Sequence, residues 1–422
     1  MSSPDEDLHI AMAAHKAERF EEAEAAYLRV LEARPNHAKA LYYLGLLLFH
    51  RGDTASAITF VQRCLSFART NGPAWNTLGG LFVAADRKAE ARDAYRRATV
   101  VAPAMGEAWY NYGICLRDEG DVDRAITALR ASLTNEPGYS RSYEALAMLF
   151  YQIGRTQESA DVYREWATRE PHNAKARHMM AAALQREVPA RAADDYVREL
   201  FDVAAKSFDT DLGRLNYRAP TRVAEALAAE AQAAARTVQD AAQTPPTASN
   251  GQPDATSVGA LASVLDAGCG TGLCGPLIRP HCERLVGVDL SPQMLERARA
   301  RQCYDELVAA ELSAFMRSRV GAFDAIVSAD TLVYFGALED PLSAAHSALC
   351  DRGLLVFTLE LLTPSSALSY RLEAHGRYTH SEQYVRDALA AAGFSVAGFV
   401  PATLREERDQ PVNGAVVTAR RV

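Results

Sequence analysis

The stretch SVLDAGCGTGLCGPLI, residues 263–278, predicts the architecture of the second half of the chain. An apolar strand ends at Asp266, a glycine-rich turn follows, and a helix opens directly after the turn. LVGVDLSPQMLERARAR, residues 285–301, repeats this arrangement, with a strand that ends at Asp289 and a helix that begins near Pro292. Two successive strand–turn–helix units predict parallel strands whose carboxyl ends meet at one edge of a sheet.

Further apolar segments continue the alternation of strands and helices at residues 305–312, 323–330 and 353–360. The final segment, residues 394–421, predicts two strands joined by a polar turn, which would form an antiparallel pair at the edge of the sheet. We therefore expect an α/β Rossmann-like domain with helices on both faces of a mostly parallel sheet.

The glycine turn allows two interpretations. Residues 270–275, GTGLCG, match the GxGxxG pattern of nicotinamide dinucleotide sites, and Asp289 follows Gly270 by 19 residues. However, Asp266 would repel a pyrophosphate, whereas it suits an ammonium group, and the sheet ends in a strand pair instead of a second dinucleotide-binding half. Glu311 ends the third strand, where it or its backbone could meet an adenine edge. The pattern favours a cofactor with an amino-acid end, and a dinucleotide remains the alternative.

The first half of the chain is an internal repeat with a period of 34 residues. A small residue recurs at this interval, and a large residue stands four positions before each one, at Leu41, Trp75, Trp109 and Tyr143; the small residues are Gly45, Gly79, Gly113 and Ala147. Proline closes most repeats, at Pro103, Pro137 and Pro171, while Arg69 stands where a proline is expected. The pattern predicts stacked helix pairs over residues 5–187, an all-α solenoid that resembles the tetratricopeptide repeat family.

First-helix positions of these repeats are expected to line an inner groove that binds a peptide or protein, or to mediate self-association. They include Tyr42, Leu46, Asn76, Tyr110, Ile114 and Glu144. The second domain is expected over residues 195–422. Within it, residues 237–258 are rich in Ala, Thr, Pro, Gln and Ser, which predicts a flexible insertion without structure of its own.

The motifs VLDAGCGTG, VGVDLSPQML and AAEL resemble those of class I S-adenosylmethionine-dependent methyltransferases. Together with the repeats in front, SADTLVYFG, GRYTHSEQYVRDALAAAGF and PVNGAVV resemble bacterial tetratricopeptide-repeat methyltransferases. The resemblance implies an enzyme that transfers a methyl group from S-adenosylmethionine to a small-molecule or protein acceptor of unknown identity. The alternative is an interaction protein whose cofactor-binding domain is catalytically silent.

The resemblance also implies roles for single residues. Gly268, Cys269, Gly270 and Gly272 would form the turn against the methionine part of the cofactor, where a side chain would collide. Asp266 would hold the ammonium group and Asp289 both ribose hydroxyls. The adenine would be contacted by residues near the ends of the second, third and fourth strands: Leu290, Met294, Glu311, Leu312 and Ala329.

Residues outside these motifs supply further candidates. Tyr217 and Arg218 could cover the cofactor carboxylate, since arginine suits a bidentate carboxylate partner; a surface arginine at a helix start is the alternative. Asp330 ends the fourth strand, where such enzymes meet cofactor and substrate. His380 is the candidate base or substrate contact, with a structural histidine before the cap residue Ser381 as the alternative. Tyr334, Glu360 and Arg377 are weaker pocket candidates.

Composition excludes several classes. A formal charge of −8 argues against a nucleic-acid partner, and no apolar run is long enough for a membrane span. The amino terminus lacks the pattern of a secretion signal, and seven scattered cysteines without CxxC spacing predict reduced thiols, no metal site and a cytoplasmic protein.

Overall fold

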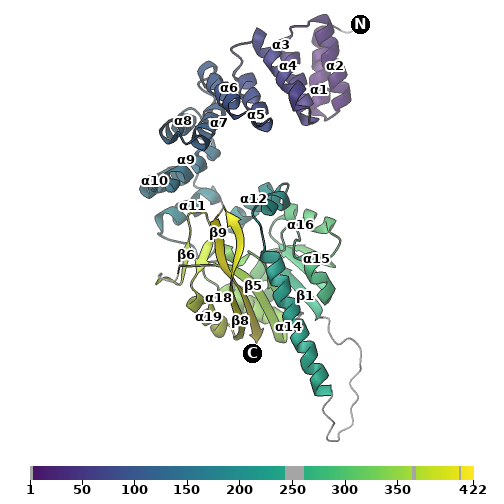
Figure 1. Cartoon of the computed structure of the whole chain (residues 1–422), viewed down its shortest axis with the longest axis vertical. Helices are drawn as coiled ribbons and strands as arrows, with labels where there is room; N and C mark the ends of the chain where they lie inside the picture. Colours follow the sequence, from purple (N-terminus) through teal and green to yellow (C-terminus); the bar gives the residue numbers. More distant parts are fainter. Residues whose placement is uncertain (1–2, 243–260, 364–366, 408–409) are drawn as a thin grey trace. The chain divides into compact units, whose positions relative to one another are not determined.

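The computed structural model describes residues 3–242, 261–363, 367–407 and 410–422 and contains two compact units, residues 1–169 and 170–422 (Figure 1). Each unit has its own buried apolar clusters. Among the described residues, no helix combines the length and apolar character needed to cross a lipid bilayer.

The described residues of the first unit form α-helices that pack as successive pairs. The first helix of each pair also packs against the preceding pair, which produces a continuous stack. The helices are α1 (Pro4–Lys16), α2 (Phe20–Ala33), α3 (Ala38–His50), α4 (Thr54–Phe67), α5 (Gly72–Ala84), α6 (Lys88–Val101), α7 (Gly106–Asp118), α8 (Val122–Asn135), α9 (Ser140–Gln152) and α10 (Thr156–Arg169).

The small residue of each repeat is required by close packing within its helix pair. A Cβ atom on Gly45 would lie 2.7 Å from Val61 Cγ2, and one on Gly79 would lie 2.5 Å from the Tyr95 ring. Val61 and Tyr95 both follow their glycine by 16 residues, so the same contact recurs along the array. The predicted solenoid of tetratricopeptide repeats is therefore confirmed.

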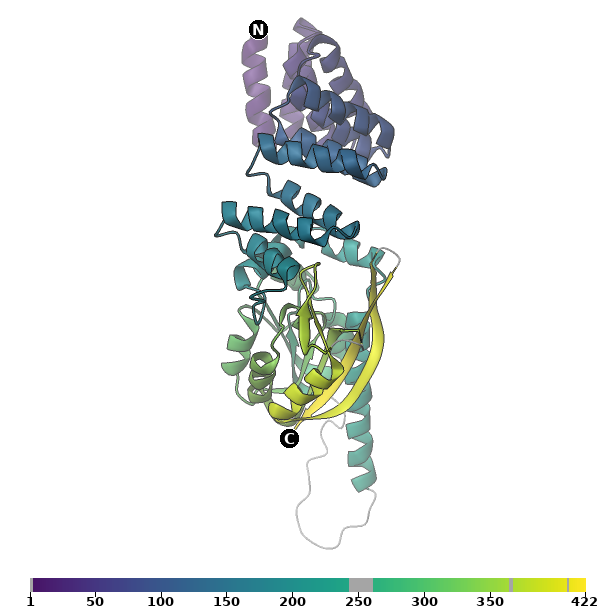
Figure 2. The same ribbon diagram turned by 90° about the vertical axis from the view of Figure 1, so that its left-hand side faces the viewer.

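The second unit is built on a sheet with the order β3-β2-β1-β4-β5-β7-β6, in which β9 pairs with β5 and β8 (Figures 1 and 2). Strands β1 to β5 are parallel neighbours, and the long β8–β9 hairpin, yellow in both figures, is antiparallel. The strands are β1 (Leu261–Ala267), β2 (Cys282–Asp289), β3 (Glu306–Ala309), β4 (Phe323–Ser328), β5 (Leu349–Leu361), β6 (Tyr370–Leu372), β7 (Tyr378–His380), β8 (Phe394–Glu407) and β9 (Gln410–Arg421).

Helices cover both faces of this sheet, as the alternation of strands and helices predicts. Leu265 and Val286 pack on one face with Phe315 of α17 (Leu312–Arg317). Val264 and Leu285 point to the other face, where they pack with α14 (Ala219–Ala242). The remaining helical elements are α11 (Ala174–Leu184), α12 (Asp194–Ala204), α13 (Phe208–Arg214), α15 (Gly275–Ile278), η1 (Arg279–His281), α16 (Pro292–Ala300), η2 (Leu332–Tyr334), α18 (Glu339–Ala348) and α19 (Glu382–Ala391).

Two boundaries differ from the expected ones. Helix α11, which the sequence assigns to the end of the array, lies in the second unit, because His178 Nε2 donates to the Gly376 carbonyl at 2.9 Å and the His178 ring stacks on Tyr196. Helix α14 continues to Ala242, so the first residues of the predicted flexible insertion are helical. Residues 243–258 of that insertion lie outside the described residues.

Candidate functional site

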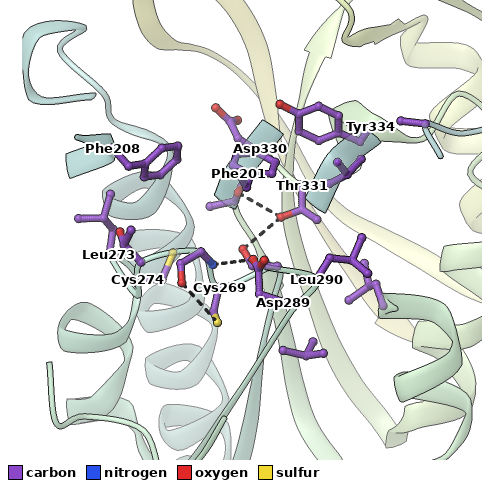
Figure 3. A pocket seen from close by; sticks show the side chains of 18 of the residues that line it. Phe201, Phe208, Cys269, Leu273, Cys274, Asp289, Leu290, Asp330, Thr331 and Tyr334 are labelled. Atoms are coloured by element: carbon purple, nitrogen blue, oxygen red, sulfur yellow. Dashed lines mark hydrogen bonds between the residues drawn. The ribbon is translucent and has the colours of Figure 1, made fainter. Parts of the chain in front are cut away.

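A pocket lies over the carboxyl ends of β1, β2 and β4 (Figure 3). It holds about 940 Å³ of empty space, within the range of small-ligand sites. Its walls come from the glycine turn, from the residues after each of these strands and from α12 and α13. Lining residues include Val197, Phe201, Phe208, Tyr217, Gly268, Cys269, Gly270, Cys274, Asp289, Leu290, Leu312, Ala329, Asp330 and Tyr334.

The three glycines of the turn have different reasons to be glycine. Each has a positive φ, at 79°, 53° and 80° for Gly268, Gly270 and Gly272. A Cβ on Gly268 would lie 2.1 Å from Thr331 Oγ1, and one on Gly272 would lie 2.9 Å from the Tyr304 ring. Only the Cβ position of Gly270 meets no atom within 4 Å. Packing of the protein on itself therefore accounts for two of these glycines, and Gly270 is the one that faces open space.

Asp289 lies in the pocket at the end of β2, with its carboxylate held by backbone groups. Its two oxygens accept hydrogen bonds from the backbone N–H groups of Gly270 and Ser291, at 2.8 and 2.9 Å. Burial raises the pKa of Asp289, while these backbone hydrogen bonds act in the opposite direction. The arrangement aims a fixed, partly buried carboxylate at a ligand hydroxyl or cation.

Asp266 is buried behind the turn and does not line the pocket. One oxygen accepts a hydrogen bond from the Tyr304 hydroxyl at 2.6 Å, and the other is buried without a partner among the described residues. Burial raises the pKa of Asp266 to about 7, the Tyr304 hydrogen bond lowers it, and the nearby Asp289 charge raises it. A buried carboxylate with a free oxygen is a suitable partner for a cationic ligand group.

Asp330 follows β4 and belongs to a network of buried charges at the same edge of the sheet. Its backbone has a φ of 53°, and its carboxylate accepts hydrogen bonds from Thr358 Oγ1 at 2.9 Å and Arg405 Nη1 at 2.7 Å. Arg405 also contacts Glu360 and Glu407, and only 5% of its side chain is exposed. Burial raises the pKa of Asp330, and Arg405 opposes this shift. Asp330 is thus fixed in position by residues far away in the sequence.

Aromatic side chains form the wall opposite the glycine turn. Phe201 of α12 packs edge-to-face against both Phe208 and Tyr334, with ring centroids 5.9 and 5.5 Å apart. The Tyr334 ring lies beside Asp330 (Figure 3). Burial raises the pKa of Tyr334 to about 12, so its hydroxyl stays protonated at neutral pH. This wall offers an apolar surface with a hydrogen-bond donor beside a carboxylate.

Many of the residues expected from the sequence meet in this pocket. Those in its lining are Tyr217, Gly268, Cys269, Gly270, Asp289, Leu290, Leu312, Ala329 and Asp330. Asp266 and Gly272 lie directly behind the turn, and Met294 is buried in α16 outside the lining. Burial raises the pKa of the Cys269 and Cys274 thiols, which keeps them protonated.

Other candidates lie outside the lining. The Glu311 carboxylate caps α17 by accepting hydrogen bonds from the N–H groups of Ser313 and Ala314, which is a structural use of the residue. Arg218 is exposed, and its Nε donates to Asn216 Oδ1 at 3.2 Å. Neither position supports the contact with cofactor that the sequence suggested for these side chains.

His380 is completely buried in β7 and does not line the pocket. Its Nε2 lies 2.9 and 3.1 Å from the carbonyl oxygens of Phe335 and Gly336, to one of which it donates. Burial lowers its pKa to about 4. The next residue, Ser381, caps α19 through its side chain. This geometry argues against His380 as a base and matches the structural histidine that the sequence left as the alternative.

The sequence pointed to none of four residues at the site. Phe201 and Phe208 come from helices before the motifs, Thr331 packs on Gly268, and Arg405 holds Asp330 from β8. Arg405 left one signal, because a charged residue in a strand that is buried there demands a partner. The phenylalanines left none, since apolar helix positions ordinarily pack in a core.

Comparison with known proteins finds two families in the chain. A methyltransferase domain matches residues 265–355, and tetratricopeptide repeats match residues 8–73, 76–140 and 116–174. Malonyl-[acyl-carrier protein] O-methyltransferase of Geobacter sulfurreducens is 32% identical over 38% of this chain and 72% of its own length. Tetratricopeptide repeat protein 8 of Caenorhabditis elegans is 26% identical over 34% of this chain and 29% of its own length.

Among solved structures, the MamA protein is 26% identical, with a TM-score of 0.37, over 41% of this chain and 94% of its own. The chain spans 29%, 43% and 52% of the length of the first curated relatives it matches. The methyltransferase match covers the strands β1 to β5 that carry the pocket, and the repeat matches cover the helix pairs of the first unit. The chain therefore belongs to the methyltransferase family, with a methyltransferase domain joined to an array of tetratricopeptide repeats.

Proposed function

We propose that this protein transfers a methyl group from S-adenosylmethionine to an acceptor in the pocket of the second unit. The observation that carries the proposal is the Asp289 carboxylate, which lies in the pocket at the end of β2 and is oriented by the N–H groups of Gly270 and Ser291. A carboxylate fixed in this way can accept hydrogen bonds from both hydroxyls of a ribose.

The other residues of the pocket fit the rest of the cofactor. Asp266 supplies a buried oxygen without a partner among the described residues, suited to an ammonium group. Leu290 and Leu312 line the pocket as apolar neighbours for an adenine ring. Gly270 leaves open space where a side chain would stand, so a ligand can approach the backbone of the turn.

The chemistry needs little from the protein. When bound, the sulfonium cofactor supplies a methyl group whose carbon–sulfur bond breaks, with the electron pair left on sulfur, as the acceptor forms its new bond to carbon. In our proposal, Asp330 and Tyr334 face the acceptor, where the carboxylate can orient a donor group or accept its proton. The aromatic wall of Phe201 and Phe208 excludes water from the transfer.

The repeats of the first unit would serve recognition of a protein or peptide, or of a second copy of the chain. Arrays of this kind present extended surfaces made from successive helix pairs. The acceptor could therefore be a small molecule that enters the pocket directly, or a group carried by a protein that the repeats hold.

Calorimetric titration of the full chain tests the cofactor. We expect saturable binding of S-adenosylmethionine and S-adenosylhomocysteine and no binding of NAD. Asp289→Ala should weaken the binding of S-adenosylhomocysteine by about tenfold or more, since the loss of two charge-assisted hydrogen bonds costs at least about 1.4 kcal/mol. Asp351→Ala is the matched control, because that side chain is 96% exposed and far from the pocket lining.

Two outcomes would remove parts of the proposal. Failure of the folded protein to bind either sulfur compound would overturn the cofactor assignment. Equal affinities for the wild type and Asp289→Ala would remove Asp289 from the ribose role, even if the cofactor binds.

A further inference from the structure

A second cleft lies in the repeat unit, between α4, α5 and α6, which Figure 1 labels. It holds about 1530 Å³ of empty space and opens to solvent. None of the positions expected to line the inner groove of the array belongs to it. Its lining consists of Gln62, Leu65, Ser66, Arg69, Trp75, Leu78, Phe82, Glu90, Asp93, Ala94, Arg96, Arg97, Val100 and Val101.

The charges in this cleft are unbalanced. Among the described residues, no carboxylate forms an ion pair with the guanidinium group of Arg69, Arg96 or Arg97. The two acidic residues of the lining are already engaged by arginines outside it. Arg87 Nε donates to Glu90 at 2.6 Å, and Arg92 forms an ion pair with Asp93 at 3.3 Å. The cleft therefore presents uncompensated positive charge.

The floor beneath these arginines is apolar. The Arg97 guanidinium lies over the Trp75 ring, 4.8 Å from its centroid, and Leu65, Leu78 and Phe82 are buried below. Val100 lines the cleft with 70% of its surface exposed. A partner that fills the cleft would cover this apolar surface and meet the arginines at the rim.

The repeat scaffold does not require these arginines, as the next repeat demonstrates. Trp109 repeats Trp75, and both indole N–H groups donate at 2.8 Å to a backbone carbonyl six residues earlier. The residues 34 positions after Arg69 and Arg97 are Pro103 and Ala131. Arg69 is thus an arginine in place of the repeat-closing proline, and Arg97 has an alanine as its counterpart. The positive, apolar character belongs to this one cleft.

We propose that this cleft binds a protein segment that carries carboxylate side chains next to apolar ones. Arginines pair well with carboxylates, and the apolar floor adds burial that a purely acidic chain would not gain. This surface differs from the inner groove, and the proposal stands independently of the methyltransferase reaction.

Fluorescence anisotropy with the full chain tests the proposal. The probe is a labelled amphipathic peptide of glutamate and leucine, and its counterparts replace each glutamate by glutamine or by lysine. We expect saturable binding of the glutamate peptide, weaker binding at high salt because the charges are exposed, and at most weak binding of the other two. Short RNA and anionic vesicles serve as competing anions.

The variants use the composition of the next repeat. Arg69→Pro combined with Arg97→Ala should weaken binding of the glutamate peptide by about tenfold or more, since each lost charge removes a carboxylate partner. Arg130→Ala, at the position 34 residues after Arg96 and outside the cleft, should leave the affinity within about twofold. Arg96→Ala tests an exposed site that cannot disturb the helix start, and circular dichroism checks the helical content of each variant.

Several results would overturn the proposal. Absence of saturable binding of the glutamate peptide would do so, as would equal binding of the lysine peptide. An equal loss in Arg130→Ala would mean that binding is not in this cleft. Preferential binding of RNA or vesicles over the peptide would assign the cleft to a different class of partner.

Discussion

The hydroxyl of Tyr304 donates a hydrogen bond to the carboxylate of Asp266 at 2.6 Å, and its ring fills the space left behind the glycine turn. Cβ atoms on Gly272, Gly275 and Gly287 would lie 2.9, 2.7 and 3.1 Å from this ring. The tyrosine therefore joins the packing of the turn to the orientation of a buried carboxylate. It stands outside the motifs that identify the family, yet it sets the charge state of the first acidic residue.

Ligand binding should depend on pH through Asp266. Its pKa is raised to about 7, so S-adenosylhomocysteine should bind more weakly as the pH falls below 7 and the carboxylate that pairs with the ammonium group is protonated. In Tyr304→Phe the midpoint should move to higher pH, because the lost hydrogen bond had favoured the ionised form. Calorimetry across this range measures both midpoints, and Asp266→Asn should abolish the dependence. A lower or unchanged midpoint in Tyr304→Phe would contradict the assignment.

The same residue affects stability with the opposite sign. The folded pKa of Asp266 lies above its ordinary value near 4, so the folded state binds the proton more tightly than the unfolded chain. Its contribution to stability is present below about pH 4 and is lost as the pH rises to about 7. Asp266→Asn should therefore flatten this part of the unfolding profile, measured by urea titration at several pH values, relative to the wild type.

Removal of Arg405 should destabilise the second unit strongly. Its guanidinium group contacts three carboxylates, of Asp330, Glu360 and Glu407, and only 5% of its side chain is exposed. Arg405→Met leaves these charges without their common partner, which should lower the free energy of unfolding by about 3–5 kcal/mol. Urea unfolding measures the change. Arg317→Ala, which breaks an exposed ion pair with Asp340, is the control and should cost at most about 1 kcal/mol.

Replacement of His380 should alter stability and leave the pH profile of methyl transfer unchanged. Its pKa is lowered to about 4, so it is neutral throughout the range in which the enzyme would be assayed. A histidine with a lowered folded pKa contributes stability that is present above its ordinary value of 6.5 and is lost as the pH falls to about 4. His380→Gln should reduce that acid sensitivity. A shift in the kinetic pH profile of the variant would restore His380 as a base.

The glycines of the turn should separate folding from ligand binding. Gly268→Ala forces a Cβ to within 2.1 Å of Thr331 and should prevent stable folding or lower the melting temperature sharply. Gly270→Ala meets no atom within 4 Å, so its cost is the backbone strain of about 1–2 kcal/mol at a φ of 53°. It should fold and lose affinity for S-adenosylhomocysteine. Melting curves and calorimetry on both variants distinguish the two cases, and unaltered affinity in Gly270→Ala would exclude close contact there.

The sequence alone determined the two kinds of architecture, because both depend on local periodicity. A 34-residue interval of small residues requires helix pairs that pack closely, and Gly45 and Gly79 meet their partners at the expected distance from the chain. Likewise, an acidic residue at the end of each of two apolar strands predicted a site at the carboxyl edge of the sheet, where Asp289 lies in the pocket.

Only the tertiary structure decided which side chains reach that pocket and which are used for packing. Arg405 comes 75 residues after Asp330 and meets it because β9 pairs with β5 and brings β8 alongside. His380 follows a strand that turns its side chain into the interior, and Glu311 is engaged by the helix it begins. Such pairings arise from contacts between distant segments, on which the spacing of residues within a motif carries no information.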